Sequence, residues 1–401
     1  MMLRFLKNIG PGTLIAAAFI GPGTVTVCTL AGVRFGYSLI WAMILSIVAT
    51  IILQEMSSRV GILTGRGLSE VIKSNITNRW VRLGGVLLIL SAIVIGNTAY
   101  EAGNISGAAL GMEALLGKAG HQLYPFIIGG VAFLLLAIGN YRFLEKSLVG
   151  LVLLMSISFV ITAVMTGPDF LEILRGIFMP EVNDANILTI AALVGTTVVP
   201  YNLFLHASLV RERWNSPEDL KASRIDTLIS VLLGGLVSVS IIICAAAVNS
   251  TAVNNVMELA MTLEPLYGSL AKYFLGIGLF AAGITSAITA PLAAAYVANG
   301  CFGWNAGLKD IRFKTVWGSI LIIGILVQTL GLKPIQLIQF AQVANGILLP
   351  VIVVFLYWIV NKKNLLGNHV NSKFQNIITF IIVLVSVFLG LRSILKVWEL
   401  F

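Results

Sequence analysis

Charge is scarce in this chain of 401 residues, because only 11% of them are Asp, Glu, Lys or Arg whereas 58% are hydrophobic. A soluble domain has too little interior to bury so much apolar surface, so the composition predicts a protein embedded in a lipid bilayer. The formal charge of +9 comes from basic residues scattered between hydrophobic runs, without the stripe or tail that binds nucleic acid. We therefore expect the bilayer, and no nucleic acid, as a partner.

Cysteine and histidine are also rare, with three residues of each. Cys28, Cys244 and Cys301 lie in or at the end of apolar segments without CxxC spacing, which indicates neither a zinc site nor a disulfide framework and favours a packing role. The chain has no GxSxG, HExxH, P-loop or dinucleotide-binding pattern. We expect no enzyme, no resident cofactor and no ATP-driven pump, so any movement of a solute is driven by gradients.

Linkers rich in proline or serine are missing as well, so the sequence predicts one transmembrane domain over residues 1–401 with no obligate protein partner. A window of about 20 residues finds eleven apolar runs. These expected spans are 10–33, 37–57, 84–113, 123–141, 147–166, 187–210, 226–249, 268–302, 315–332, 335–361 and 374–395.

Two of these runs are interrupted near their middle, at Gly21-Pro22-Gly23-Thr24 and at Val198-Val199-Pro200-Tyr201-Asn202. An unpaired backbone group in a bilayer costs several kcal/mol, so a broken helix persists only where protein, ion or cavity water satisfies it. Each break lies in the first span of a set of five, which is typical of inverted repeats that meet at a midplane site. We expect repeats at about 10–166 and 187–361, an extra helix at 374–395, and transport by alternating access.

The Lys and Arg residues predict the orientation. With the N-terminus in the cytoplasm and eleven spans, 19 of the 26 fall on the inner side and 7 on the outer side. Such an excess favours this topology over its inverse. We expect an integral protein of a bacterial inner membrane with its C-terminus outside.

Several stretches of the chain resemble the natural-resistance-associated macrophage protein (NRAMP) family of proton-coupled divalent metal transporters. They are Gly10-Pro11-Gly12-Thr13-Leu14-Ile15-Ala16, Gly21-Pro22-Gly23-Thr24, Arg59-Val60-Gly61-Ile62-Leu63-Thr64-Gly65, Pro200-Tyr201-Asn202-Leu203-Phe204-Leu205-His206, Ala281-Ala282-Gly283, and Gln342-Val343 with Pro350. The resemblance implies a LeuT-like fold of 5+5 inverted repeats with discontinuous first and sixth helices. It also implies symport of a metal ion with H+.

The chain departs from the family pattern at its metal ligands. Gly21 stands where the family has aspartate, Thr24 where it has asparagine, Val199 in place of a methionine and Tyr201 in place of a histidine. Thioether sulfur favours softer transition metals, so its loss predicts weaker selection for manganese or iron. Without the carboxylate, a divalent ion either stays partly hydrated or takes its counter-charge from another acid.

The expected ion ligands are main-chain carbonyls near Gly21 and Thr196, the Thr24 hydroxyl, and the side chains of Tyr201, Asn202 and Gln342, with Glu101 as the source of negative charge. The full set of candidates for substrate or ion binding is Gly21, Thr24, Thr196, Val199, Tyr201, Asn202, Gln342 and Asn345. Tyr201 is either a weak oxygen ligand or a plug that fills space left by histidine. Gln342 and Asn345 either face the ion or bond helix to helix.

Glu101 is the acid near the middle of a span, at the position of an acidic residue on the family's proton route. It is either a proton carrier or counter-charge, or a structural acid bonded to neighbouring helices. Asn97 and Asn104 share its helical face, and Asn104 stands where the family has a second acid. Because the ninth span also lacks an arginine, we expect weakened proton coupling.

Two further sites carry a functional and a structural reading. His206, six residues after Pro200, either handles protons in a wet cavity or is a neutral histidine bonded within the bundle. Glu55 precedes Arg59 by four residues, which predicts a salt bridge or an inner gate.

The leading hypothesis is a carrier of divalent cations with a preference shifted toward harder or partly hydrated ions. The first alternative is a carrier of a small organic solute such as an amino acid, whose carboxylate would bind the exposed amides at the first break. The second is a sensor or scaffold that transports nothing.

Overall fold

The computed structural model describes residues 20–139, 142–248, 253, 255–304 and 306–398. These residues form helices joined by turns, and no strand occurs among them. The α-helices are α3 (Pro22–Phe35), α4 (Ile40–Thr64), α5 (Leu68–Asn75), α6 (Arg79–Leu116), α7 (Tyr124–Ile138), α8 (Arg142–Met165), α9 (Phe170–Phe178), α10 (Ile187–Thr197), α11 (Pro200–Val210), α12 (Leu220–Ala246), α13 (Val256–Ala260), α14 (Glu264–Tyr267), α15 (Ala271–Phe302), α16 (Ile311–Val327), α17 (Pro334–Val360), α18 (Lys363–Leu366) and α19 (Lys373–Trp398).

The expected all-helical membrane fold is confirmed. Nine segments of the described chain are long and apolar enough to cross a membrane, and α7 is a shorter apolar helix at the expected fourth span. The first expected span, 10–33, is described only from Ile20 onward, and the segment 10–16 lies outside the described residues. Boundaries differ most at α4, which ends at Thr64 and not at 57, and at α12, which begins at Leu220 and not at 226. Each helix continues there through charged or polar residues that a hydropathy window leaves out. The limits of the two repeats stay a prediction.

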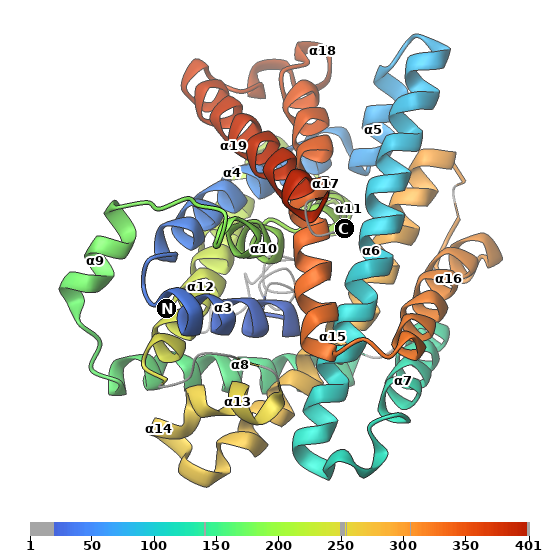
Figure 1. Ribbon diagram of the computed structural model, residues 1–401. Coiled ribbons are helices and arrows are strands. Elements are labelled where there is room, and N and C mark those ends of the chain that lie inside the picture. The colour runs from blue at the N-terminus through green and yellow to red at the C-terminus, as the bar shows by residue number, and fades with distance from the viewer. Residues whose placement is uncertain (1–19, 140–141, 249–252, 254, 305, 399–401) are drawn as a thin grey trace.

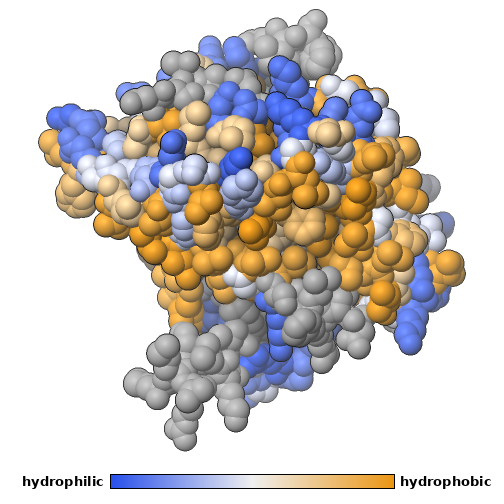
Figure 2. All heavy atoms as spheres, turned by 90° about the horizontal axis from the view of Figure 1, so that it is seen from below, coloured by the Kyte–Doolittle hydropathy of each residue, from blue (hydrophilic) through white to orange (hydrophobic). Residues whose placement is uncertain are grey.

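The outer surface of the helix bundle is apolar. Many large hydrophobic side chains are exposed, among them Leu87, Phe126, Leu233 and Phe380. Figure 2 shows hydrophobic residues across much of one face, with hydrophilic residues toward its edges. Such a surface would aggregate in water and is typical of contact with lipid.

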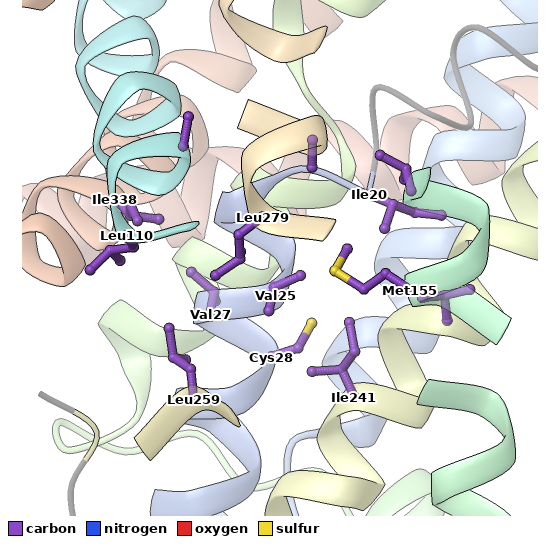
Figure 3. Packing of buried hydrophobic residues seen from close by; sticks show 14 of the residues in the cluster. Ile20, Val25, Val27, Cys28, Leu110, Met155, Ile241, Leu259, Leu279 and Ile338 are labelled. Atoms are coloured by element: carbon purple, nitrogen blue, oxygen red, sulfur yellow. The ribbon is translucent and has the colours of Figure 1, made fainter. Parts of the chain in front are cut away.

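Helix α3 is buried along most of its length, from Pro22 to Gly32. Figure 3 shows Val25, Val27 and Cys28 of α3 among apolar side chains of several other helices. The labelled neighbours are Ile20, Leu110, Met155, Ile241, Leu259, Leu279 and Ile338. The three cysteines are free and buried, in agreement with the predicted packing role. A helix surrounded in this way reaches the centre of the protein without contact with lipid.

The predicted break in the sixth span is present. Helix α10 ends at Thr197, Val198 and Val199 have non-helical backbone angles, and α11 begins at Pro200. Proline has no N–H and its ring crowds the carbonyl four residues earlier, so the helix cannot continue through this point. At the first break, α3 begins at Pro22 after the extended residue Gly21. Both prolines therefore occupy the first position of a new helix, where a missing N–H costs nothing.

The two breaks lie at the centre of the bundle. Helix α3 contacts α10, α17 and α6, and α10 contacts α17. Figure 1 shows α3 next to α10, with α17 and α6 close to its N-terminal end. The most extensive helix pair is α6 with α15, and its close approach requires glycine: a Cβ atom on Gly111 would lie 2.5 Å from the backbone nitrogen of Phe280. These four helices α3, α6, α10 and α17 enclose the candidate site.

Candidate functional site

The hydroxyls of Thr24 and Thr196 are hydrogen-bonded to each other across the two breaks, at 2.8 Å between their oxygens. The two residues are 172 positions apart in the sequence, and both side chains are buried. Thr24 lies in the first turn of α3, and Thr196 in the last turn of α10. The two interrupted helices thus meet through oxygen atoms in the interior of the protein.

The backbone at the second break leaves a carbonyl available. Pro200 has no N–H for the carbonyl of Thr196, and no other described donor is hydrogen-bonded to that oxygen. At the first break, Gly21 has no side chain to cap the first amides of α3, and its own carbonyl accepts from the Val25 N–H at 3.2 Å. The expected ligand role therefore suits the Thr196 carbonyl better than that of Gly21, which is already bonded in this conformation.

Gln342 of α17 lies directly against both broken helices. A Cβ atom on Gly23 would be 2.6 Å from the Cδ of Gln342, and one on Gly195 would be 2.8 Å from the backbone nitrogen of Gly346. The Gln342 side chain is buried, and its amide oxygen has no hydrogen-bond partner among the described residues. An unpaired buried amide oxygen is a ready ligand for a hard cation.

Asn202 and Tyr201 begin α11 beside the break and are fully buried. Neither the amide of Asn202 nor the hydroxyl of Tyr201 is hydrogen-bonded within the described part of the chain. The Tyr201 ring packs edge-on against Tyr100 of α6, with 5.4 Å between ring centroids. The structure thus places Tyr201 both as a filler of space and as a source of an unsatisfied oxygen.

Val199 and Asn345 differ from the other candidates. Val199 is the residue that precedes α11 in the break, and its buried side chain offers no polar atom. The carboxamide of Asn345 faces α6, since its Oδ1 would be 3.7 Å from a Cβ atom on Gly96. Its Nδ2 has no partner among the described residues. Asn345 therefore lies one turn along α17 from Gln342, between helices.

Comparison with known proteins identifies the family. The sequence model described as "Natural resistance-associated macrophage protein-like" (Nramp) matches residues 12–396. The chain belongs to this family. The divalent metal cation transporter MntH of Bacillus subtilis is 28% identical over 407 residues, which cover 98% of this chain and 93% of that protein. The protein of the same name from Caldanaerobacter subterraneus is 27% identical over 386 residues, covering 93% and 89%.

Solved structures show the same fold. The manganese transporter of Eremococcus coleocola superposes on this Nramp chain with a TM-score of 0.81 at 20% identity, covering 96% of this chain and 86% of that one. MhsT in complex with L-phenylalanine has a TM-score of 0.63 at 14% identity, covering 96% and 98%. Agreement across such distant sequences confirms the LeuT-like arrangement.

The site of this Nramp protein lacks a cluster of strong metal ligands. Among the described residues, no group of three or more His, Cys, Asp or Glu side chains lies together as a metal site would require. What the two breaks do present are hydroxyl, amide and carbonyl oxygens from Thr24, Thr196, Asn202 and Gln342. Neutral oxygen ligands of this kind are typical of hard cations and of ions that keep part of their water.

Glu101 lies on a different side of α6 from the breaks. A Cβ atom on Gly324 of α16 would be 2.7 Å from the Glu101 Cγ, so the side chain packs against α16. Its Oε2 accepts a hydrogen bond from Asn104 at 3.4 Å, and its Oε1 has no partner in the described structure. Tyr100, one residue earlier, faces α11 instead. Glu101 therefore lies behind Tyr100 rather than beside the Thr24 and Thr196 hydroxyls.

Two polar residues near Glu101 were missed by the sequence reasoning. Gln328, after the end of α16, donates to the carbonyl of Ala102 at 2.9 Å and accepts from the Ser106 hydroxyl at 2.9 Å. The signal was a glutamine at the end of an apolar run, which alone does not distinguish a loop residue from an interior one. Asn97 and Asn104, which were expected to share one helical face with Glu101, have different partners. Asn104 bonds Glu101, whereas Asn97 donates to the Ala290 carbonyl of α15 at 2.7 Å.

His206 is fully buried on α11, one turn from Asn202. Its Nδ1 is 2.7 Å from Oε1 of Gln54 in α4, and its Nε2 has no described partner. Nearby, the Ser57 hydroxyl of α4 donates to the Leu203 carbonyl. These bonds hold α11 on α4, and one ring nitrogen of His206 stays buried without a partner among the described residues. Gln54 was not singled out in the sequence because nothing near it marks a site.

Proposed function

We propose that this Nramp-family chain moves divalent cations across a membrane by alternating access around the hydrogen-bonded pair Thr24 and Thr196. That pair carries the proposal, because it brings the two helix breaks together in a buried place lined by unsatisfied oxygens. The names of the MntH relatives and of the Eremococcus manganese transporter point to the same class of substrate. The cation would be substrate, and the chain would need no resident cofactor and no enzymatic activity.

The oxygen ligands favour a hard or partly hydrated ion. An ion between α3 and α10 would break the hydrogen bond between the two hydroxyls, bind both of their oxygens, and take the Thr196 carbonyl and the amide oxygens of Gln342 and Asn202 as further ligands. Magnesium holds its water tightly and is bound through a few protein oxygens, whereas manganese and iron gain more from nitrogen and sulfur. The proposal therefore places magnesium or calcium on a level with manganese.

Flux measurements test the proposal directly. The protein, reconstituted in liposomes, is expected to admit magnesium, calcium and manganese, with Thr24→Val and Thr196→Val each lowering uptake at least tenfold. Thr162→Val is the matched control, because Thr162 is a buried threonine of α8 whose hydroxyl, within the described part of the chain, bonds only the Ser158 carbonyl of its own helix. Absence of uptake for all three ions in the unchanged protein would refute divalent cation transport.

A carrier of a small organic solute is a second candidate, and one observation favours it. The first turn of α3 and that of α11 both begin at the breaks, and neither is capped by a side chain. The positive end of a helix attracts a carboxylate, and no acid at position 21 repels one here. Thermal-shift screening of divalent ions beside amino acids separates the candidates, since only a ligand that binds the folded protein raises its melting temperature.

Orientation and coupling complete the proposal. The excess of Lys and Arg between alternate spans supports a cytoplasmic N-terminus, an external C-terminus and insertion in a bacterial inner membrane. The proton is the candidate coupling ion, with Glu101 and His206 as its carriers and Asn104 as the neighbour of Glu101. No Lys or Arg of the described chain forms an ion pair with Glu101, which supports weak coupling.

A further inference from the structure

A cavity with a largely apolar wall and a few polar groups lies between α4, α12 and α19, and none of the residues at the helix breaks lines it. Its volume is about 360 Å³. It lies beside the N-terminal ends of α12 and α19 and the middle of α4. The residues that line it are Ile51, Ile52, Glu55, Met56, Arg224, Thr227, Leu228, Asn371 and Gln375. Transport around Thr24 and Thr196 makes no use of this cavity.

The charged groups at this cavity, counted together with Arg59 behind its wall, sum to one positive charge. Glu55 is its carboxylate, and both of its oxygens are occupied: Oε1 by the Nε of Arg224 at 2.8 Å and Oε2 by Nη2 of Arg59 at 3.2 Å. Arg59 lies behind Glu55, buried, and also donates to the His369 carbonyl at 2.8 Å and to Oδ1 of Asn371 at 2.5 Å. Two guanidinium groups against one carboxylate leave one positive charge, which an anion would neutralise.

Hydrogen-bond donors remain available at the same place. Only the Nε of Arg224 has a described acceptor, and the side chain is 49% exposed at the mouth of the cavity, so its two terminal nitrogens can reach an anion. Thr227 also lines the cavity, and its hydroxyl is buried in the wall with no partner among the described residues. Guanidinium and hydroxyl donors that converge in this way are typical of phosphate binding.

The apolar part of the wall indicates where the phosphate comes from. Ile51, Ile52 and Leu228 form one side, and Leu228 is 42% exposed on the surface of the bundle that faces lipid. Lys221, one turn before Arg224, and Lys373, at the start of α19, are exposed at the same end. Asp226 lies on the opposite face of α12. A charged head with apolar chains matches this surface better than a free ion.

We propose that this cavity binds the phosphate of an anionic phospholipid, with Arg224 and Thr227 as its donors and the acyl chains against Leu228 and Ile51. The inference rests on the proposed orientation, which puts this end of α19 in the cytoplasmic leaflet. Basic pockets between helices on that side are known to hold anionic headgroups. A lipid in this place would contact α4, α12 and α19 together. These three helices are far apart along the chain, and the lipid would be a ligand that they share.

Lipid binding to the purified full-length protein tests the proposal. Native mass spectrometry after delipidation measures the apparent affinity for phosphatidylglycerol and, at equal concentration, for phosphatidylcholine. We expect tighter binding of phosphatidylglycerol, and a loss of about fivefold for Arg224→Gln, the effect of one basic residue at a membrane surface. Thr227→Val, which keeps the shape and the charge, is expected to weaken binding as well, and Thr227→Ser to restore it.

Arg392→Gln is the matched control. Arg392 is 47% exposed and pairs with Asp184 at 3.1 Å, away from the cavity, so its removal subtracts one charge without touching the proposed site. An equal loss in this control, or equal binding of the two lipids, would overturn the proposal. Displacement of the lipid by inorganic phosphate alone would assign the site to a free anion and overturn it too. Because binding is read without any flux, a failure of cation transport leaves this result standing.

Discussion

The side-chain amide of Gln342 in α17 fills the space beside Gly23 of α3. A Cβ atom on Gly23 would lie only 2.6 Å from the Cδ atom of Gln342. Residue 23 is therefore glycine because a polar side chain from another helix needs the space. Pro22, one residue earlier, fits in the same way against Gly107 of α6. The start of α3 is thus fixed by contacts from α6 and α17, both of which border the candidate site.

Gly23→Ala should displace Gln342 from the site. We expect the added methyl group to cost about 1–3 kcal/mol of stability, as overpacking in a close-packed interior does, and to lower cation uptake at least tenfold. The double variant with Gln342→Ala removes the clash and should regain the stability but not the uptake. Gly130→Ala, where a Cβ atom meets nothing within 4 Å, is the control for thermal unfolding and flux.

Val199→Met should change the preference among ions. A thioether placed at the start of α11 adds a soft ligand beside Thr196, and soft ligands favour cadmium and manganese over magnesium. We expect the ratio of cadmium to magnesium uptake to rise about tenfold, measured in liposomes with both ions present. Val199→Leu has a similar size without sulfur, and an equal rise in that variant would show that the added volume, not the sulfur, is responsible.

Glu101→Gln should separate ion movement from proton movement. The glutamine can keep the hydrogen bond from Asn104 because its amide oxygen still accepts, but it cannot carry a proton. We expect the response of uptake to an imposed pH gradient to disappear, while uptake without a gradient changes less than twofold. Glu113→Gln, on the same helix, is the control. A gradient response that survives Glu101→Gln would exclude Glu101 as the carrier.

Arg59→Met should destabilise the protein strongly. The buried guanidinium joins Glu55, Asn371 and the His369 carbonyl, and removal of one partner from a buried ion pair costs about 3–5 kcal/mol. The matched control is Arg66→Met, which removes an exposed pair with Glu70 at 3.5 Å and should cost no more than about 1 kcal/mol. Chemical denaturation in detergent would measure the free energy of unfolding of both variants. Equal losses of stability would contradict the structural role assigned to Arg59.

Much of the site could be located from the sequence. Pro22 and Pro200 each interrupt an apolar run, and a proline in such a run breaks the helix whatever surrounds it. The salt bridge between Glu55 and Arg59, confirmed at 3.2 Å, also follows from a spacing of four on one helix. What the spacing did not show was the direction in which Glu101 points, because one step along α6 turns a side chain by about 100°. That turn separates Glu101 from Tyr100.

Local apolarity and the chemistry of proline, both of which can be read along the chain, set the bilayer environment, the helices and the places where the helices break. The tertiary structure decided which oxygens meet. Thr24 and Thr196 lie where glycines leave room for neighbouring helices: Gly23 for the Gln342 side chain, Gly107 for the Pro22 ring and Gly195 for the backbone of α17. Such approach depends on the fit of distant surfaces, which no stretch of sequence contains alone.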